Sequence, residues 1–191
     1  MTLREYIDRL RGKTVAVIGI GVSNTPLLRL LLREGISVTA CDRSSREKLG
    51  ALAGELEAAG AKLQLGDGYL QNLSQDVIFR TPGLRPDVPE LEAARAKGST
   101  ITSEMEVFFE VCPCPIIAVT GSDGKTTTTT IIAQLLRAAG HTVHVGGNIG
   151  HPLLAEADTI RPTDWAVLEL SSFQLMTMTH SPHIAVVTNL A

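Results

Sequence analysis

The chain has 191 residues, and its 17 lysine and arginine residues against 20 aspartate and glutamate residues give a formal net charge of −3. This mildly acidic balance offers no overall attraction for nucleic acid or an anionic membrane, and a hydrophobic content of 44% excludes a mainly disordered chain. Three cysteines, an odd and low count, fit a reducing compartment, so we expect a globular cytoplasmic protein.

The first half of the chain alternates between apolar stretches of strand length and stretches of helical length, after a charged, helix-like segment at residues 1–10. Strands are expected at residues 14–19, 36–41, 61–65, 76–79 and 100–102. Helices are expected at residues 27–33, 45–59, 86–97 and 104–111. Strands that alternate with helices of this length predict βαβ units and a parallel sheet.

The second half repeats this pattern after the prolines of residues 112–115, which end regular structure and place a domain boundary. Strands are expected at residues 116–120, 142–145, 165–170 and 184–188, with a helix at 125–139. We predict an α/β protein with a Rossmann-like, parallel-sheet domain at 1–112 and an α/β domain with a phosphate loop at 113–191. The chain ends just past a strand, where parallel sheets keep their ligand sites, so we expect a truncated second domain and a longer native protein.

The strongest motif is Thr120-Gly-Ser-Asp-Gly-Lys-Thr126, which follows an apolar strand and opens a helix. The backbone N–H groups of such a loop, together with the helix N-terminus, form a site for phosphate. We expect the ammonium of Lys125 at the β- and γ-phosphates of a nucleotide and the hydroxyl of Thr126 at Mg²⁺. Val119 stands where the full phosphate-loop pattern has glycine. A plain turn with a surface lysine is the alternative.

Other polar residues follow neighbouring strands of the second half. Glu169 ends a strand and suits a direct or indirect Mg²⁺ ligand, although a solvated carboxylate is the alternative. Asn148 lies in a glycine-rich loop and would serve either a ligand or a turn. The pair Cys112 and Cys114 lacks the second ligand pair that zinc needs, and redox pairing stays open without support from the sequence.

The first half carries a weaker motif, Gly19-Ile-Gly-Val-Ser-Asn24, followed by Asp42 at the end of the next strand. This spacing indicates a nucleotide near the turn, but the third glycine of the dinucleotide pattern is replaced by Asn24. A side chain there should hinder close packing of helix and strand, which argues against NAD. The alternative is that Gly19 and Gly21 only permit the tight turn.

Taken together, these residues resemble the Mur ligases, the ATP-dependent amide ligases of peptidoglycan precursor synthesis. The resemblance covers essentially the whole chain and rests on residues 17–23, 81–84 with 104–108, 120–127, 147–150 and 169–175. The segment Glu169-Leu-Ser-Ser-Phe-Gln-Leu175 beside the phosphate loop is similar to the members that add D-glutamate. Another Mur ligase, such as the L-alanine-adding enzyme, and a nicotinamide-binding sensor fused to an NTPase are the alternatives.

The resemblance implies that ATP and Mg²⁺ activate the carboxylate of UDP-N-acetylmuramoyl-L-alanine as an acyl phosphate, which D-glutamate then attacks. It implies that ATP is bound by Gly121, Ser122, Asp123, Gly124, Lys125, Thr126 and Thr127. It implies that the muramoyl substrate is bound by Val22, Ser23, Asp42, Gly83, Asn148 and Ser171. Lys125 and Glu169 would be catalytic, and Thr126 and Glu169 would hold the metal.

The family pattern continues beyond what this chain contains. Its histidine-containing metal segment, carbamylated lysine and third domain, which binds D-glutamate, are absent from the 191 residues. We therefore expect this chain to form no amide bond by itself. We also expect a monomer that takes small-molecule substrates and binds neither nucleic acid nor membrane.

Overall fold

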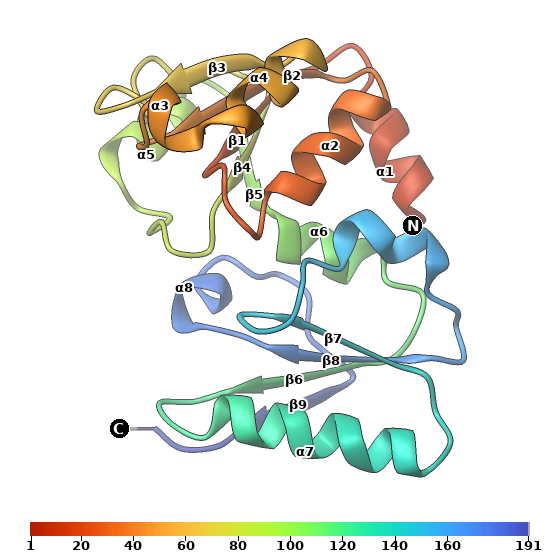
Figure 1. Cartoon of the computed structure of the whole chain (residues 1–191). Coiled ribbons are helices and arrows are strands. Elements are labelled where there is room, and N and C mark those ends of the chain that lie inside the picture. The colour runs from red at the N-terminus through yellow and green to blue at the C-terminus, as the bar shows by residue number, and fades with distance from the viewer. Residues whose placement is uncertain (191) are drawn as a thin grey trace. The chain divides into compact units, whose positions relative to one another are not determined.

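The computed structural model describes residues 1–190, and it divides into two compact units (Figure 1). One unit is Glu5–Glu104; the other combines Met1–Arg4 with Met105–Ala191. The division falls after Glu104, the first residue of helix α6 (Glu104–Val111), whereas the sequence places the domain boundary after this helix. Ala191, the last residue of the expected second domain, lies outside the described residues.

The first unit contains a five-stranded sheet in the order β3-β2-β1-β4-β5, and every neighbouring pair is parallel. Its strands are β1 (Thr14–Ile18), β2 (Ser37–Asp42), β3 (Lys62–Leu65), β4 (Val77–Arg80) and β5 (Thr100–Ser103). The expected Rossmann-like parallel sheet is confirmed. The strand order reverses between β1 and β4, and ligands of such sheets bind at the carboxyl ends of the strands beside this reversal.

The helices of the first unit include α1 (Leu3–Leu10), which precedes β1 and whose first two residues belong to the other unit. The helices that connect the strands are α2 (Thr25–Arg33), α3 (Arg46–Leu49), α4 (Ala51–Ala58) and α5 (Pro89–Ala96). The single helix expected at residues 45–59 is wrong, because Gly50 adopts φ 57° and ψ −131° and separates α3 from α4. That positive φ is accessible to glycine at little cost and interrupts the helical hydrogen bonds.

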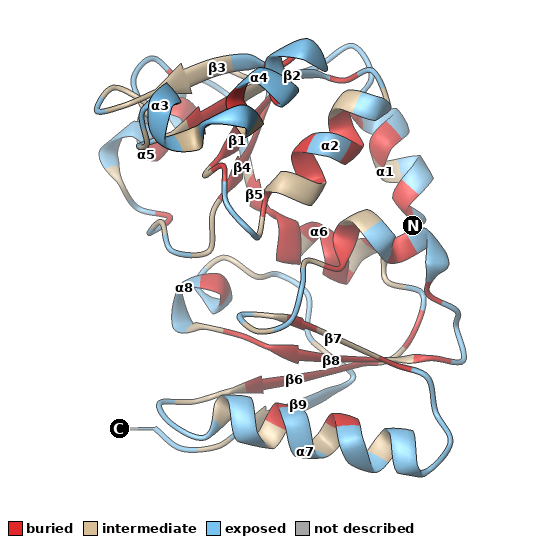
Figure 2. Ribbon diagram, viewed as in Figure 1, coloured by how far each residue is buried: buried red, intermediate tan, exposed pale blue. Residues whose placement is uncertain are grey.

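The core of the first unit is built on β1, whose residues Val15, Ala16, Val17 and Ile18 are fully buried (Figure 2). Helix α2 adds one apolar face, with Leu27, Leu28, Leu30 and Leu31 buried. A strand buried on both faces reads as a continuous apolar run, as Val-Ala-Val-Ile does here. This rigid strand fixes the position of the glycine-containing turn that follows it.

The second unit contains a four-stranded parallel sheet in the order β7-β8-β6-β9. Its strands are β6 (Ile116–Thr120), β7 (Val143–Gly147), β8 (Trp165–Glu169) and β9 (Ile184–Val187). Helix α7 (Lys125–Ala138) packs on this sheet through a cluster that includes Ala133, Val143 and Val167 (Figure 1). The short helices η1 (Leu154–Thr159) and α8 (Ser172–Leu175) were not predicted.

None of the helices among the described residues is long and apolar enough to cross a membrane.

Candidate functional site

The phosphate-loop motif forms a strand–loop–helix, with β6 before it and α7 after it. Gly121 has φ 136°, and a Cβ atom there would overlap the hydroxyl of Thr188 and lie 2.9 Å from the carbonyl oxygen of Asn189. Gly124, the N-cap of α7, is left-handed with φ 78°. Both conformations favour glycine, which explains why the loop carries glycine at these two positions.

The segment after β9 closes over this loop, a contact that the sequence did not reveal. The backbone N–H of Asp123 donates to Asn189 Oδ1 at 2.8 Å, and that of Ser122 donates to the Asn189 carbonyl at 3.1 Å. The Thr188 hydroxyl donates to the Asp123 carbonyl at 2.5 Å. Two of the expected phosphate donors are therefore engaged within the chain. The N–H groups at the start of α7 have no acceptor inside their helix and remain the natural anion donors.

Lys125 is folded back over the loop that precedes it. Its Nζ donates to the carbonyl oxygens of Gly121 at 2.7 Å and Ser122 at 2.8 Å. The side chain borders a cavity of about 450 Å³, lined by Thr120, Gly121, Ser122, Lys125, Asn148, Ser171, Ser172, Leu175 and Leu190. An ammonium has three N–H donors, so it can hold the loop and also meet an anion in this cavity.

Thr126 and Glu169 are joined directly, although they are far apart in the sequence. The Thr126 hydroxyl donates to Glu169 Oε2 at 2.7 Å, and Glu169 is only 4% exposed. Its position depends on β7, because the Asn148 N–H donates to the Glu169 carbonyl at 2.9 Å and a Cβ atom on Gly147 would overlap that carbonyl oxygen. The pair brings a hydroxyl and a carboxylate together beside the start of α7.

This donor set suits Mg²⁺. Hydroxyl and carboxylate oxygens are the hard ligands that Mg²⁺ prefers, and it commonly takes only one or two of them from the protein. Within the residues that the structure describes, no group of three or more histidine, cysteine, aspartate or glutamate side chains gathers as a metal cage would require. The pair Thr126 and Glu169 therefore fits a magnesium ion shared with a phosphate ligand.

Ser171 and Asn148 both reach the cavity in front of Lys125. Ser171 caps α8: its hydroxyl accepts from the Gln174 N–H, and the Gln174 side-chain oxygen accepts from the Ser171 N–H at 2.9 Å. Gln174 is buried, so this capping box holds the serine at the end of β8. Of the other expected ATP residues, Asp123, Gly124, Thr126 and Thr127 do not line the cavity itself.

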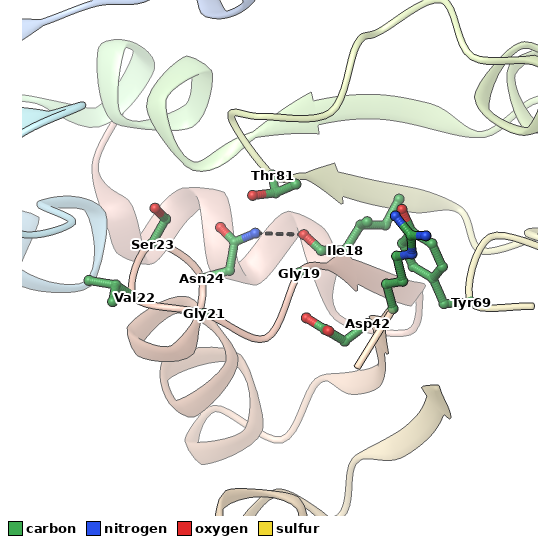
Figure 3. Close-up of a pocket in the computed structure, with 10 residues that line it drawn as sticks. Ile18, Gly19, Gly21, Val22, Ser23, Asn24, Asp42, Tyr69 and Thr81 are labelled. Atoms are coloured by element: carbon green, nitrogen blue, oxygen red, sulfur yellow. Dashed lines mark hydrogen bonds between the residues drawn. The ribbon is translucent and has the colours of Figure 1, made fainter. Parts of the chain in front are cut away.

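A second cavity, of about 370 Å³, lies in the first unit at the carboxyl ends of β1 and β4 (Figure 3). It is lined by Ile18, Gly19, Gly21, Val22, Ser23, Asn24, Asp42, Arg43, Tyr69 and Thr81. The structure thus brings together the predicted residues Val22, Ser23 and Asp42. Gly83 is not among the lining residues; Thr81 of the same loop takes that place. Arg43 and Tyr69 lack any sequence signal that would have singled them out.

The Asp42 carboxylate is engaged by the backbone around it. Oδ2 accepts from the Ile20 N–H at 2.6 Å, and Oδ1 accepts from the Ser44 N–H at 2.7 Å. A carboxylate with a proton donor on each oxygen holds the two turns after β1 and β2 in place. Each oxygen still has lone pairs for a ligand donor.

Asn24 corrects one sequence argument. Its side chain was expected to hinder close packing of helix and strand, yet it is 1% exposed and its Nδ2 donates to the Ile18 carbonyl at 2.8 Å (Figure 3). The amide thus turns back along β1 instead of separating α2 from the sheet. Its Oδ1 has no hydrogen-bond partner among residues 1–190.

Comparison with known proteins supports one family over the whole chain. Residues 119–191 match the Mur ligase middle domain. A protein of Acetivibrio thermocellus named UDP-N-acetylmuramoylalanine–D-glutamate ligase is 52% identical over 190 residues, which cover 99% of this chain and 41% of the relative. A Clostridium novyi protein of the same name is 51% identical over 191 residues, covering 100% of this chain and 42% of the relative.

Two solved structures show the same fold. A UDP-N-acetylmuramate:L-alanyl-gamma-D-glutamyl-meso-diaminopimelate ligase from Neisseria meningitides superposes with a TM-score of 0.53 at 21% identity, over 94% of this chain and 61% of that one. A UDP-N-acetylmuramate-alanine ligase from Thermotoga maritima superposes with a TM-score of 0.50 at 22% identity. This match covers 93% of this chain and 41% of that one. This chain spans about two fifths of the length of the curated relatives. On its matched middle domain and its half-identical relatives, the chain belongs to the Mur ligase family.

Proposed function

We propose that this chain supplies the ATP-binding and muramoyl-binding parts of a cytoplasmic ligase that adds D-glutamate to UDP-N-acetylmuramoyl-L-alanine. The observation that carries the proposal is the arrangement of Lys125 with the pair Thr126 and Glu169 around the start of α7. The printed name of the half-identical relatives supports the choice of D-glutamate as the added amino acid. We place the D-glutamate site and further metal ligands outside these 191 residues.

In this proposal, ATP binds at residues 121–127. The first N–H groups of α7 and the positive end of its dipole meet the phosphate oxygens, and Lys125 exchanges a loop carbonyl for the γ-phosphate. Thr126 and Glu169 would hold Mg²⁺, which supplies positive charge that offsets the repulsion between phosphate and carboxylate oxygens. The monomeric chain then presents one nucleotide site in its second unit.

The reaction needs activation because a carboxylate oxygen is a poor leaving group. The alanine carboxylate attacks the γ-phosphorus of ATP, ADP departs, and an acyl phosphate forms. The amine of D-glutamate then attacks the acyl carbon, loses a proton, and expels inorganic phosphate. This chain positions the reacting groups and neutralises their negative charge. Lys125 and the N-terminus of α7 hold the phosphates in line for the attack. Asn148 and Ser171 orient the muramoyl-alanine end of the substrate.

The first unit would bind the uridine nucleotide of the substrate. Val22 and Ser23 lie on the turn after β1, and Asp42 follows β2, so all three border one cavity at the carboxyl edge of the sheet. Gly83 stays part of the proposed site because it lies in the same loop as Thr81, which borders the cavity. The backbone N–H groups of such a turn suit a diphosphate.

A chimera tests this function. We would join this chain to the remaining part of the Acetivibrio thermocellus relative and measure phosphate release. The proposal expects release only with ATP, UDP-N-acetylmuramoyl-L-alanine and D-glutamate together, and expects Lys125→Ala to abolish it while the exposed control Lys97→Ala does not. Phosphate release with L-alanine and UDP-N-acetylmuramate instead of these substrates would favour the L-alanine-adding reaction and overturn the assignment.

A further inference from the structure

Two cysteines face each other in the short connection between α6 and β6. The sulfur atoms of Cys112 and Cys114 lie 3.6 Å apart, and the Cys112 sulfur is also 3.6 Å from the Cys114 carbonyl oxygen. Neither sulfur takes part in the nucleotide or muramoyl sites described above. We propose that Cys112 and Cys114 are a thiol–disulfide pair, in which Cys112 reacts with a peroxide and Cys114 then closes an intrachain disulfide.

The geometry of the connection allows this bond. Residues separated by one position have Cα atoms no more than about 7 Å apart, close to the upper end of the range found in disulfides. Sulfur atoms at 3.6 Å are in van der Waals contact, so their Cβ–Sγ bonds already converge. Pro113, between them, holds its own φ near −65°, which narrows the set of shapes that the connection adopts. Rotation of the two side chains has to shorten this distance to the roughly 2.05 Å of a disulfide.

The two thiols differ in access, which assigns their roles. Cys112 is partly exposed, whereas Cys114 is only 2% exposed. The hydrogen bond from the Cys114 thiol lowers the pKa of Cys112, and the same contact, followed by burial, raises the pKa of Cys114. A partly exposed thiol with a lowered pKa is the usual attacking group, and a buried neighbour is the usual resolving group.

Cys41 provides an internal reference within the same chain. It is fully buried in β2, and burial followed by the nearby Asp42 raises the pKa of its thiol to about 12. Thiolate is the reacting form, so Cys41 should react far more slowly than Cys112 with the same oxidant. Comparing the oxidation of Cys41 with that of Cys112 and Cys114 therefore distinguishes a selective reaction of the pair from general oxidation of the chain.

The proposed reaction balances with one peroxide for each disulfide. The Cys112 thiolate attacks one oxygen of hydrogen peroxide, the O–O bond breaks, and the hydroxide that leaves takes a proton to become water. The sulfur is now a sulfenic acid. The Cys114 sulfur attacks it, the S–O bond breaks, and the hydroxyl leaves as a second water with the Cys114 proton. Two thiols have lost two electrons to one peroxide.

Peptide mapping tests the pair directly. The reduced chain is treated with a small excess of hydrogen peroxide, unfolded, alkylated and digested with trypsin, which places Cys41 in peptide 34–43 and the pair in peptide 98–125. The proposal expects peptide 98–125 to carry no alkyl group and to be two hydrogen atoms lighter than the reduced, unalkylated peptide. Reduction with dithiothreitol before alkylation should restore both alkyl groups. Peptide 34–43 should keep its alkyl group throughout.

Variants separate this route from others. Cys114→Ser should stop at a sulfenic acid on Cys112 that dimedone captures, Cys112→Ser should leave Cys114 alkylated, and the control Cys41→Ser should behave as the unaltered chain. Full alkylation of both thiols after peroxide, oxidation of Cys41 at the same rate, or a disulfide that links two chains would each overturn the proposal.

Discussion

Replacing Gly147 by alanine should destabilise the second unit much more than the same replacement at Gly140. Both glycines have nearly the same positive φ, 92° and 88°, so the cost of placing a side chain in that conformation is common to both. They differ in their surroundings. A Cβ atom on Gly147 would overlap the Glu169 carbonyl oxygen and lie 2.9 Å from the carbonyl carbon, while nothing lies within 4 Å of one on Gly140.

The expected loss of unfolding free energy in each variant follows from the cost of the backbone conformation and the cost of the overlap. The left-handed conformation costs an alanine about 1–2 kcal/mol, and this is all that Gly140→Ala should lose. At Gly147 the backbone of β8 must also move, which resembles the overpacking of a core and costs about 1–3 kcal/mol more. The total for Gly147→Ala is then about 2–5 kcal/mol.

Urea unfolding followed by tryptophan fluorescence measures the difference. Trp165, the only tryptophan of the chain, begins β8 and therefore reports on the unit that contains both glycines. With a slope of about 2 kcal/mol per M urea, the Gly147→Ala midpoint should fall roughly 1 M below that of Gly140→Ala. Equal midpoints for the two variants would refute the close approach of β7 to the Glu169 carbonyl.

Three further predictions concern the first unit. Asn24→Ala removes the Nδ2 bond to the Ile18 carbonyl and should cost about 1–3 kcal/mol in urea unfolding followed by circular dichroism; unchanged stability would contradict the role of this amide. Hydrogen bonds from the Thr14 N–H and hydroxyl lower the pKa of Asp76, so its stabilisation is present above the unfolded pKa and is lost as the pH falls through the folded one. Below about pH 4 the unfolding free energy of the unaltered chain should therefore fall more steeply than that of Asp76→Asn. Parallel pH profiles for the two proteins would contradict this role of Asp76. Chemical-shift mapping should show saturable changes around the first cavity with UDP-N-acetylmuramoyl-L-alanine, and saturable changes with NAD alone would reverse the substrate assignment.

The sequence predicted the architecture well because strand and helix periodicity is local information. The parallel sheets and the turn into α7 followed from apolar runs, glycines and element lengths. The expected long helix at 45–59 failed at Gly50, where a glycine inside a helical pattern proved to be a true break. The short helices η1 and α8 escaped prediction because four to six residues carry too little periodicity.

The sites were only partly predictable, because their contacts join distant parts of the chain. The motif drew attention to Lys125 and Glu169, but only the structure shows the Thr126 hydroxyl bonded to that carboxylate. Nothing in the sequence indicated that Asn189 would occupy two N–H groups of the phosphate loop. Likewise, a side chain at Asn24 reads as an obstacle until its bond to β1 is seen.

Calorimetric titration with ATP and Mg²⁺ tests the central claim, that the loop before α7 is a nucleotide site, most directly. Removing the ammonium in Lys125→Ala should cost about 1.5–3 kcal/mol, or roughly a 10- to 150-fold loss of affinity. The lower part of that range is expected, because Nζ must first exchange its bonds to Gly121 and Ser122. The matched control Lys97→Ala, in the other unit, should bind as the unaltered chain does. Equal ATP affinity in Lys125→Ala and the unaltered chain would contradict the account.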